Sequence, residues 1–272
     1  MVSSNSYQWA SGDAYERCDG RWGRMVAGEF VQWLRMPEAR AWVDVGCGTG
    51  ELTRAILQHA NPHSVTAVDL AEGFIEYARA NTADERATFI VGDACAIPIA
   101  DASTDCVIAG LVLNFVRSHV QMLREMHRIL TFDGVAGLYV WDYSKDMQLL
   151  RAFWDAAIEI DTGARCRDEG HIFPICHPDR LRSALESAGL VDIDVRKIDV
   201  VTVFRDFEDY WTPFLSGHGG PAPAYAMSLS EKQRTALREK LRSRLLPEPD
   251  GSIRLIARAW GARAAKPSRL AQ

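Results

Sequence analysis

The chain has 272 residues, of which 47% are hydrophobic and 25% are charged, with six cysteines. This composition is typical of a globular protein and excludes a disordered, collagen-like or disulfide-scaffold protein. The net charge of −5 argues against a wholly basic nucleic-acid binder, but it conceals an asymmetry. Residues 230–272 carry 11 basic and 4 acidic side chains, whereas residues 1–229 carry 20 basic and 32 acidic ones. Such a basic segment indicates either an anionic partner or a solvated helix face.

No secretory leader or membrane span is expected in this sequence. The first 25 residues include acidic side chains and lack an apolar stretch. The longest apolar run, Cys106–Val116, is interrupted by Asn114 and is shorter than the ~18 residues that a spanning helix needs. Because the cysteines form no C-x-x-C pair, we expect reduced thiols in a cytoplasmic protein.

Strand-like apolar runs alternate with helix-like segments from residue 42 to residue 141. In chain order, the expected strands are Trp42–Val45, Ser64–Val68, Thr88–Val91, Asp105–Val112, Val135–Trp141, Asp192–Phe204 and Ser252–Gly261. The expected helices are Trp22–Leu34, Glu51–His59, Glu72–Ala80, Val120–Leu130, Met147–Ile160, Pro178–Ala188 and Leu229–Leu245.

This alternation predicts an α/β protein with a Rossmann-like, doubly wound and mostly parallel sheet. Ligands of such sheets bind at the carboxyl ends of the strands. Along the chain, we expect an N-terminal lid and helix over 1–36, a ligand-binding core over 37–142, and a C-terminal part over 143–272. The last part is expected to complete the sheet and to contribute substrate-cap segments at about 143–180 and 206–245.

The central motif is the glycine-rich sequence Val43–Leu52, which lies between a strand and a helix. Its glycines allow a sharp turn and the close approach of a ligand. Asp69 closes the next strand, where a carboxylate is placed to accept both ribose hydroxyls of an adenosine ligand. Asp93 closes the third strand, where it is placed to accept the exocyclic amine of adenine.

Two other interpretations of these acids remain open. An aspartate at a strand end often caps the following helix, and Asp69 and Asp93 are both placed to do so. Asp44, inside the first strand, is interpreted as holding the loop through backbone amides.

The glycine spacing distinguishes between adenosine ligands. A dinucleotide site normally reads G-x-G-x-x-G, but here Glu51 occupies the position of the third glycine. A carboxylate at the start of the helix is poorly suited to a pyrophosphate on that N-terminus. S-adenosylmethionine, which carries no phosphate, is therefore favoured.

Four blocks of sequence carry a family resemblance: VDVGCGTGEL, VTAVDLAEGFIEYARAN, FIVGDACAIPIADASTDCVIAGLVLNFV and MLREMHRILTFDGVAGLYVWD. With these blocks, residues 40–142 resemble the class I S-adenosylmethionine-dependent methyltransferases, in particular the type-11 group of ubiquinone/menaquinone-biosynthesis enzymes. The resemblance implies a seven-stranded sheet with an antiparallel last strand and helical lid or cap insertions. It also implies an enzyme that uses S-adenosyl-L-methionine and releases S-adenosyl-L-homocysteine.

The resemblance assigns cofactor contacts residue by residue. It implies that Asp69 holds the ribose and that Arg24 pairs with the carboxylate at the amino-acid end of the cofactor. The full set of implied cofactor-binding residues is Tyr15, Arg24, Gly46, Cys47, Gly48, Asp69, Leu70, Asp93, Ala94 and Leu111.

The methyl acceptor is expected to be a small molecule that reacts through O, N or C. The segment Ala109–Val112 lacks the Asn/Asp-Pro-Pro-Tyr motif of exocyclic-amine methyltransferases, and the chain contains no Pro-Cys nucleophile. Aromatic residues of the cap region are the candidate walls of the acceptor pocket, although cap core is the alternative for each. They are Trp141, Tyr143, Trp154, Phe173, Tyr210, Trp211 and Phe214.

No catalytic residue is identified from the sequence, and a general base is needed only if the acceptor must lose a proton early. The candidates for such a base or for an acceptor contact are His171, His177, His218 and Asp142. No metal site is expected, because the spacing of Cys166, His171, Cys176 and His177 matches no compact zinc pattern.

Two other functions stay open. One is a nucleic-acid methyltransferase that uses the basic residues of 232–244, and the other is a non-catalytic S-adenosylmethionine-binding module. Leu237, Leu241 and Leu245 recur at helical spacing among those basic residues, which favours a packed and solvated cap helix without a nucleic-acid partner.

Overall fold

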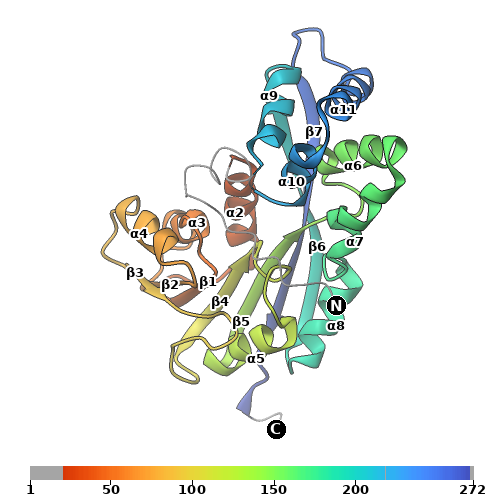
Figure 1. Ribbon diagram of the computed structural model, residues 1–272. Helices are drawn as coiled ribbons and strands as arrows, with labels where there is room; N and C mark the ends of the chain where they lie inside the picture. The colour runs from red at the N-terminus through yellow and green to blue at the C-terminus, as the bar shows by residue number, and fades with distance from the viewer. Residues whose placement is uncertain (1–20, 218, 270–272) are drawn as a thin grey trace. The chain divides into compact units, whose positions relative to one another are not determined.

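The computed structural model describes residues 21–217 and 219–269 and contains one seven-stranded sheet. Its strands follow the order β3-β2-β1-β4-β5-β7-β6. β1, β2, β3, β4 and β5 are parallel, and β7 pairs antiparallel with β5. This confirms the predicted Rossmann-like sheet with an antiparallel last strand. Figure 1 labels these strands.

The strands are β1 (Ala41–Val45), β2 (Ser64–Asp69), β3 (Ala87–Val91), β4 (Thr104–Gly110), β5 (Leu130–Trp141), β6 (Val191–Phe204) and β7 (Ile253–Ala265). The α-helices are α2 (Arg21–Leu34), α3 (Glu51–His59), α4 (Glu72–Ala80), α5 (His119–Ile129), α6 (Gln148–Ile160), α7 (Glu169–Ile172), α8 (Pro178–Ser187), α9 (Phe207–Trp211), α10 (Pro221–Ser228) and α11 (Glu231–Arg244). Two 3₁₀ helices, η2 (Thr162–Arg167) and η3 (Thr212–Ser216), complete the described elements.

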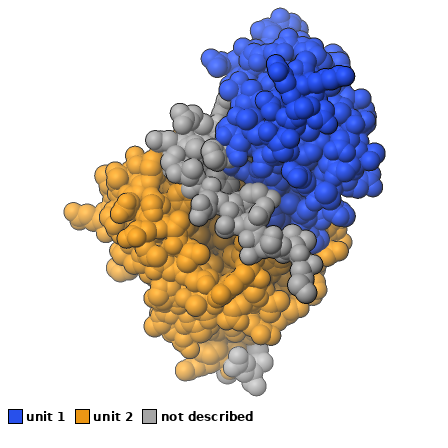
Figure 2. Space-filling model, in the orientation of Figure 1, with its two compact units in different colours: residues 1–22, 142–174, 199–258 blue, residues 23–141, 175–198, 259–272 orange. Residues whose placement is uncertain are grey.

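The chain folds into two compact units, coloured in Figure 2. Of the described residues, unit 1 comprises 21–22, 142–174, 199–217 and 219–258, and unit 2 comprises 23–141, 175–198 and 259–269. β6 and β7 continue from one unit into the other. The domain boundaries expected from the sequence stay predictions.

Unit 2 contains the parallel strands. Apolar residues on both faces of the sheet hold these strands in register. β4 is mostly buried, as the nearly unbroken apolar sequence from Cys106 onward predicts. α2 packs so closely on β5 that a Cβ added to Gly137 would lie 3.0 Å from both Leu34 and Phe30. Phe30 also packs against Tyr139, with ring centroids 4.9 Å apart.

Unit 1 is built around an aromatic core. Phe153 of α6 stacks on Phe214 of η3, with centroids 4.5 Å apart. Trp154 packs against Tyr225 of α10 at 5.4 Å. The hydroxyl of Tyr210 donates to the carbonyl of Leu149 at 2.9 Å, so this buried polar group is satisfied.

α11 presents a basic outer face whose charges are paired within unit 1. Arg238 and Arg242 both donate to Oε1 of Glu208, at 2.5 and 2.8 Å. Lys240 and Arg244 pair with Glu159. Leu237 and Leu241 are buried on the opposite face. This is the packed and solvated helix that the leucine spacing predicts.

Unit 1 also contains a buried acid, Glu169, which is only 3% exposed. Its carboxylate accepts hydrogen bonds from Nε1 of Trp154 and from the backbone N–H of Ala222, 3.3 Å away. Its neighbour Asp168 is neutralised by Arg151, whose Nη1 donates to both carboxylate oxygens at 2.7 and 2.9 Å. Burial raises the pKa of Glu169 from 4.5 to about 8, although its hydrogen bonds oppose the rise.

This raised pKa predicts a pH-dependent stability. The folded protein binds a proton at Glu169 that the unfolded chain releases near pH 4.5, so the free energy of unfolding falls as the pH rises from about 4.5 to about 8. Glu169→Gln removes this slope. We expect its stability relative to the wild type to improve by a few kcal/mol across this pH range in urea unfolding.

Glu159→Gln is the matched control, because ion pairs lower the pKa of Glu159. Its contribution is therefore constant above pH 5, and its stability difference from the wild type should not change across the same series. Parallel pH curves for Glu169→Gln and the wild type would contradict the assignment.

Candidate functional site

The glycine loop after β1 is fastened to the end of β2 by backbone hydrogen bonds. The N–H groups of Gly46 and Cys47 both donate to the carbonyl of Val68, at 2.7 and 3.0 Å. Gly46 and Gly48 have φ values of +73° and +51°, a region that residues with a Cβ rarely adopt. A Cβ on Gly46 would lie 2.4 Å from Val112, whereas a Cβ on Gly48 would meet nothing within 4 Å. Gly48 therefore presents open backbone to a ligand.

Asp69 connects this loop to the carboxyl end of β2. Its Oδ2 accepts from the N–H of Gly48 and its Oδ1 accepts from the N–H of Ala71, both at 2.9 Å. Burial raises the pKa of Asp69, and the backbone hydrogen bonds partly offset that rise. The backbone of Leu70 also contributes a hydrogen bond, so Asp69 holds the loop through backbone donors and keeps part of its acceptor capacity for a ligand. It does not cap α4, whose N-cap is Ala71.

Asp93 follows β3 and is tied into a tight turn. Its Oδ1 accepts from the N–H of Cys95 at 2.7 Å, and its other oxygen pairs with Arg117 at 3.0 Å. Asp93 forms a bridge with Ala96, and no helix begins there within the described structure. The helix-capping interpretation therefore fails for this aspartate also.

Asp44 differs from the interpretation made from the sequence. It lies fully buried in β1 and accepts from the hydroxyl of Thr53 in α3 at 2.6 Å, whereas its Oδ1 has no partner among the described residues. Burial raises the pKa of Asp44 to about 7. Asp44 thus ties β1 to α3, and the loop amides instead bind Val68 and Asp69.

The start of α3 carries a paired acid. Glu51 forms ion pairs with Arg54 at 2.5 Å and with Arg24 at 3.2 Å. Arg24 is 62% exposed, and a ligand carboxylate would have to share it with Glu51. Its predicted role in binding a carboxylate stays a prediction, and Tyr15 lies outside the described residues.

The other predicted contacts have different environments. Cys47 points its side chain into a buried cluster with Ala67 and Phe89, and burial raises the pKa of its thiol. Only its backbone therefore faces the loop. Leu70 is 70% exposed, and Ala94 is half-buried. Their predicted contacts with adenine stay predictions.

Leu111, the last predicted cofactor contact, is strained. Its φ of +59° is unusual for a residue with a Cβ, and its N–H donates to the carbonyl of Tyr139 at 2.8 Å. Such outliers concentrate at functional sites. The next residue, Val112, fills the space beside Gly46, so the loop after β4 touches the glycine loop.

The predicted acceptor-pocket aromatics are mainly core residues in the structure. Trp154, Tyr210, Trp211 and Phe214 are buried in unit 1, and Trp141 is buried in unit 2. Tyr143 and Phe173 pack together, with centroids 5.7 Å apart. Their role in binding an acceptor stays a prediction.

The weak catalytic candidates are spread over the chain. His171 is exposed, and His177 caps α8 by accepting from the N–H of Asp179 at 3.3 Å. Asp142 is buried and accepts from Ser144 at 2.9 Å, while His218 lies outside the described residues. Over 21–217 and 219–269, no group of three or more His, Cys, Asp or Glu residues is arranged to hold a metal. No helix there is long and apolar enough to cross a bilayer.

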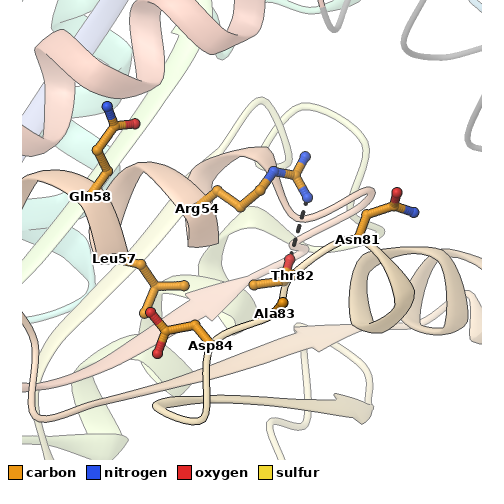
Figure 3. A pocket seen from close by; sticks show the side chains of 7 residues that line it. All are labelled: Arg54, Leu57, Gln58, Asn81, Thr82, Ala83 and Asp84. Atoms are coloured by element: carbon orange, nitrogen blue, oxygen red, sulfur yellow. Dashed lines mark hydrogen bonds between the residues drawn. The ribbon is translucent and has the colours of Figure 1, made fainter.

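A separate surface hollow of about 270 Å³ lies between α3 and the segment after α4. Figure 3 shows Arg54 reaching across it to Thr82, with 3.4 Å between Nη1 and the hydroxyl. Arg54 also donates to the carbonyl of Thr49 at 3.0 Å. None of the residues predicted to bind the cofactor, such as Asp69 and Asp93, lines this hollow.

Alanine substitutions of Gly46 and Gly48 are expected to differ in their effect on stability. Gly46→Ala introduces a Cβ at positive φ and a clash with Val112, and we expect it to lower the free energy of unfolding by roughly 2 kcal/mol or more. Gly48→Ala is the matched control, since it carries the same backbone strain without the clash and should cost only about 1 kcal/mol. Chemical denaturation measures both. Equal losses would contradict the close contact at Gly46.

Part of the chain is similar to known methyltransferases. Residues 43–138 match the methyltransferase-domain family. A 95-residue stretch is 36% identical to demethylmenaquinone methyltransferase of Staphylococcus aureus. This stretch covers 34% of this chain and 39% of that protein. The match thus spans about two fifths of the length of this curated relative.

Two solved structures resemble most of the chain. The YcgJ protein of Bacillus subtilis superposes with a TM-score of 0.58 at 16% identity, covering 90% of this chain and 99% of that one. Phosphoethanolamine N-methyltransferase 2 of Haemonchus contortus, in complex with phosphomonomethylethanolamine and S-adenosylhomocysteine, has a TM-score of 0.59 at 15% identity. That superposition covers 95% of this chain and 57% of the other.

The matched segment runs from β1 into β5 and includes the glycine loop, Asp69 and Asp93. Residues 43–138 are therefore similar to the methyltransferase-domain family, and the chain as a whole has a fold like that of the solved methyltransferase from Haemonchus contortus.

Proposed function

We propose that the protein is an enzyme that transfers a methyl group from S-adenosylmethionine to a small-molecule acceptor. The observation that carries the proposal is Asp69, which lies at the carboxyl end of β2, holds the amide of the open Gly48 and retains acceptor capacity for a ligand. A carboxylate in this position suits the two adjacent hydroxyls of a ribose.

The residues fit the remainder of the ligand. Asp93 and Ala94 lie at the end of β3, the next strand along the sheet, where an adenine joined to the ribose would extend. Glu51 disfavours a pyrophosphate at the start of α3. A nicotinamide or flavin dinucleotide is therefore the poorer candidate.

The chemistry requires little from the protein beyond position. When bound, S-adenosylmethionine would supply a methyl group on a positively charged sulfur that leaves as a neutral thioether, and a proton on the attacking oxygen or nitrogen would pass to solvent. The chain contributes by holding donor and acceptor in line, which can supply most of the acceleration. Asp69 and the glycine loop fix the donor end, and the loop after β4 borders the reacting end.

The acceptor is proposed to be small, in keeping with two relatives. The solved neighbour from Haemonchus contortus binds phosphomonomethylethanolamine, and the curated relative is named for demethylmenaquinone. These names extend to the class of acceptor only. A screen of hydroxylated, aminated and quinol compounds with labelled cofactor identifies the acceptor, and cofactor binding without any turnover would favour a non-catalytic module.

The nucleic-acid alternative receives little support from α11. Four of its cations are paired with Glu159 and Glu208, and Arg234 donates to the carbonyls of Ala226 and Leu229. Most of these cations are thus held in contacts within the chain. We expect no salt-sensitive binding of RNA or duplex DNA in a titration at physiological ionic strength, and a steep salt dependence would support this alternative.

Asp69→Asn tests the cofactor site. The variant keeps one acceptor oxygen but loses the charge that strengthens both ribose hydrogen bonds. We expect S-adenosylhomocysteine to bind about a hundredfold more weakly in calorimetry, equivalent to about 3 kcal/mol.

Asp105→Asn is the matched control. Asp105 also accepts from a backbone N–H, that of Ala41 at 2.9 Å, but at the opposite end of the parallel strands. Its affinity should equal that of the wild type. Unchanged affinity in Asp69→Asn would refute the assignment of this site.

A further inference from the structure

Asn114 is a buried side chain whose hydrogen bonds are unmade. It is only 6% exposed, and neither its amide nitrogen nor its amide oxygen has a partner among the described residues. A buried amide without partners costs roughly 1–3 kcal/mol for each unsatisfied group. Such a group in a folded protein requires an explanation, and a bound ligand is one.

The loop that carries Asn114 has two other unusual features. Leu111, three residues earlier, has a φ of +59°. Val112 packs against Gly46 of the glycine loop so closely that no Cβ fits between them. Backbone strain, close contact with the proposed cofactor loop and an unsatisfied amide thus occur within four consecutive residues.

The order of the strands places this loop at the reacting end of the proposed ligand. β1 lies between β2 and β4, so Asp69, the glycine loop and the loop of Asn114 follow one another along the carboxyl edge of the sheet. Neighbouring strands are about 4.8 Å apart, so this path spans about 10 Å. A cofactor whose ribose lies at Asp69 and whose chain crosses Gly48 extends toward the loop after β4.

We propose that Asn114 is a specificity-determining residue whose amide binds the acceptor group that receives the methyl. Its carbonyl oxygen accepts a hydrogen bond from the O–H or N–H of the nucleophile, and its NH₂ group donates to a second polar atom of the acceptor. The acceptor is therefore a hydroxyl or amine compound, since a nucleophilic carbon alone would leave the amide unpaired. The inference rests on the proposed function and specifies its substrate class.

Two cofactor analogues test the inference without a known acceptor. Sinefungin carries an amine at the position of the transferred methyl group, and S-adenosylhomocysteine carries nothing there. The amine projects its N–H bonds into the space assigned to Asn114. In Asn114→Leu, we expect sinefungin to bind about tenfold more weakly or worse, while the affinity for S-adenosylhomocysteine stays within about threefold of the wild type.

The thermal stability of the same variant is an independent readout. Leu removes an unpaired amide and adds apolar contact, so we expect a melting temperature equal to or above that of the wild type. Thr104→Val is the matched control, because the hydroxyl of Thr104 is buried at the other end of β4 and donates to the carbonyl of Ala41 at 2.9 Å. This control should lower the melting temperature and leave the ratio of the two affinities unchanged.

Asn114→Asp supplies a second variant, because its carboxylate retains an oxygen that accepts from the amine. We expect it to keep the wild-type preference for sinefungin even if Asn114→Leu folds poorly. Loss of the sinefungin preference in Asn114→Leu together with its loss in Asn114→Asp would overturn the inference.

The inference about Asn114 and the proposed function are refuted by different results. If wild type and Asn114→Leu bind both analogues with the same ratio of affinities, the inference is wrong and the proposed cofactor site stands. If the wild type binds neither analogue, the proposed function is wrong and the inference fails with it.

Discussion

The hydrogen bond from the Gly48 amide to the Asp69 carboxylate is the interaction on which the proposed site depends. It joins the loop after β1 to the end of β2, two segments 21 residues apart in sequence. Because the carboxylate is partly buried, the bond competes less with water than an exposed one and fixes the direction of the carboxylate oxygens. The same contact therefore shapes the backbone of the loop and prepares an acceptor for a ligand.

The sequence predicts the architecture well where a single physical rule dominates. The nearly unbroken apolar residues of Asp105–Val112 predict β4, and the glycines between a strand and a helix predict the sharp loop after β1. α10 was missed because Gly219, Gly220, Pro221 and Pro223 indicate a loop. Prolines fit the first turn of a helix, where the missing N–H groups have no partner in any case, and this exception outweighed the general rule.

The site was less predictable because it depends on tertiary partners. The aromatic residues of 143–225 have the composition of either a pocket or a core, and only packing reveals that Trp154 and Phe214 are core residues. Asp44 binds Thr53, a choice that the sequence does not specify. Asn114 did leave a signal, since it is the one polar residue in the apolar run Cys106–Val116. Its significance follows only from burial without partners.

The two units differ in the kinds of residues that they carry. Unit 2 carries the family motifs and the acids at the strand ends, and unit 1 carries the aromatic core and the buried Glu169. A crystal structure with S-adenosylhomocysteine tests the central claim most directly. The account predicts both ribose hydroxyls within about 2.5–3.0 Å of the Asp69 oxygens, with Gly48 beneath the ligand. A ligand bound elsewhere, such as the hollow beside Arg54 and Thr82, would contradict it.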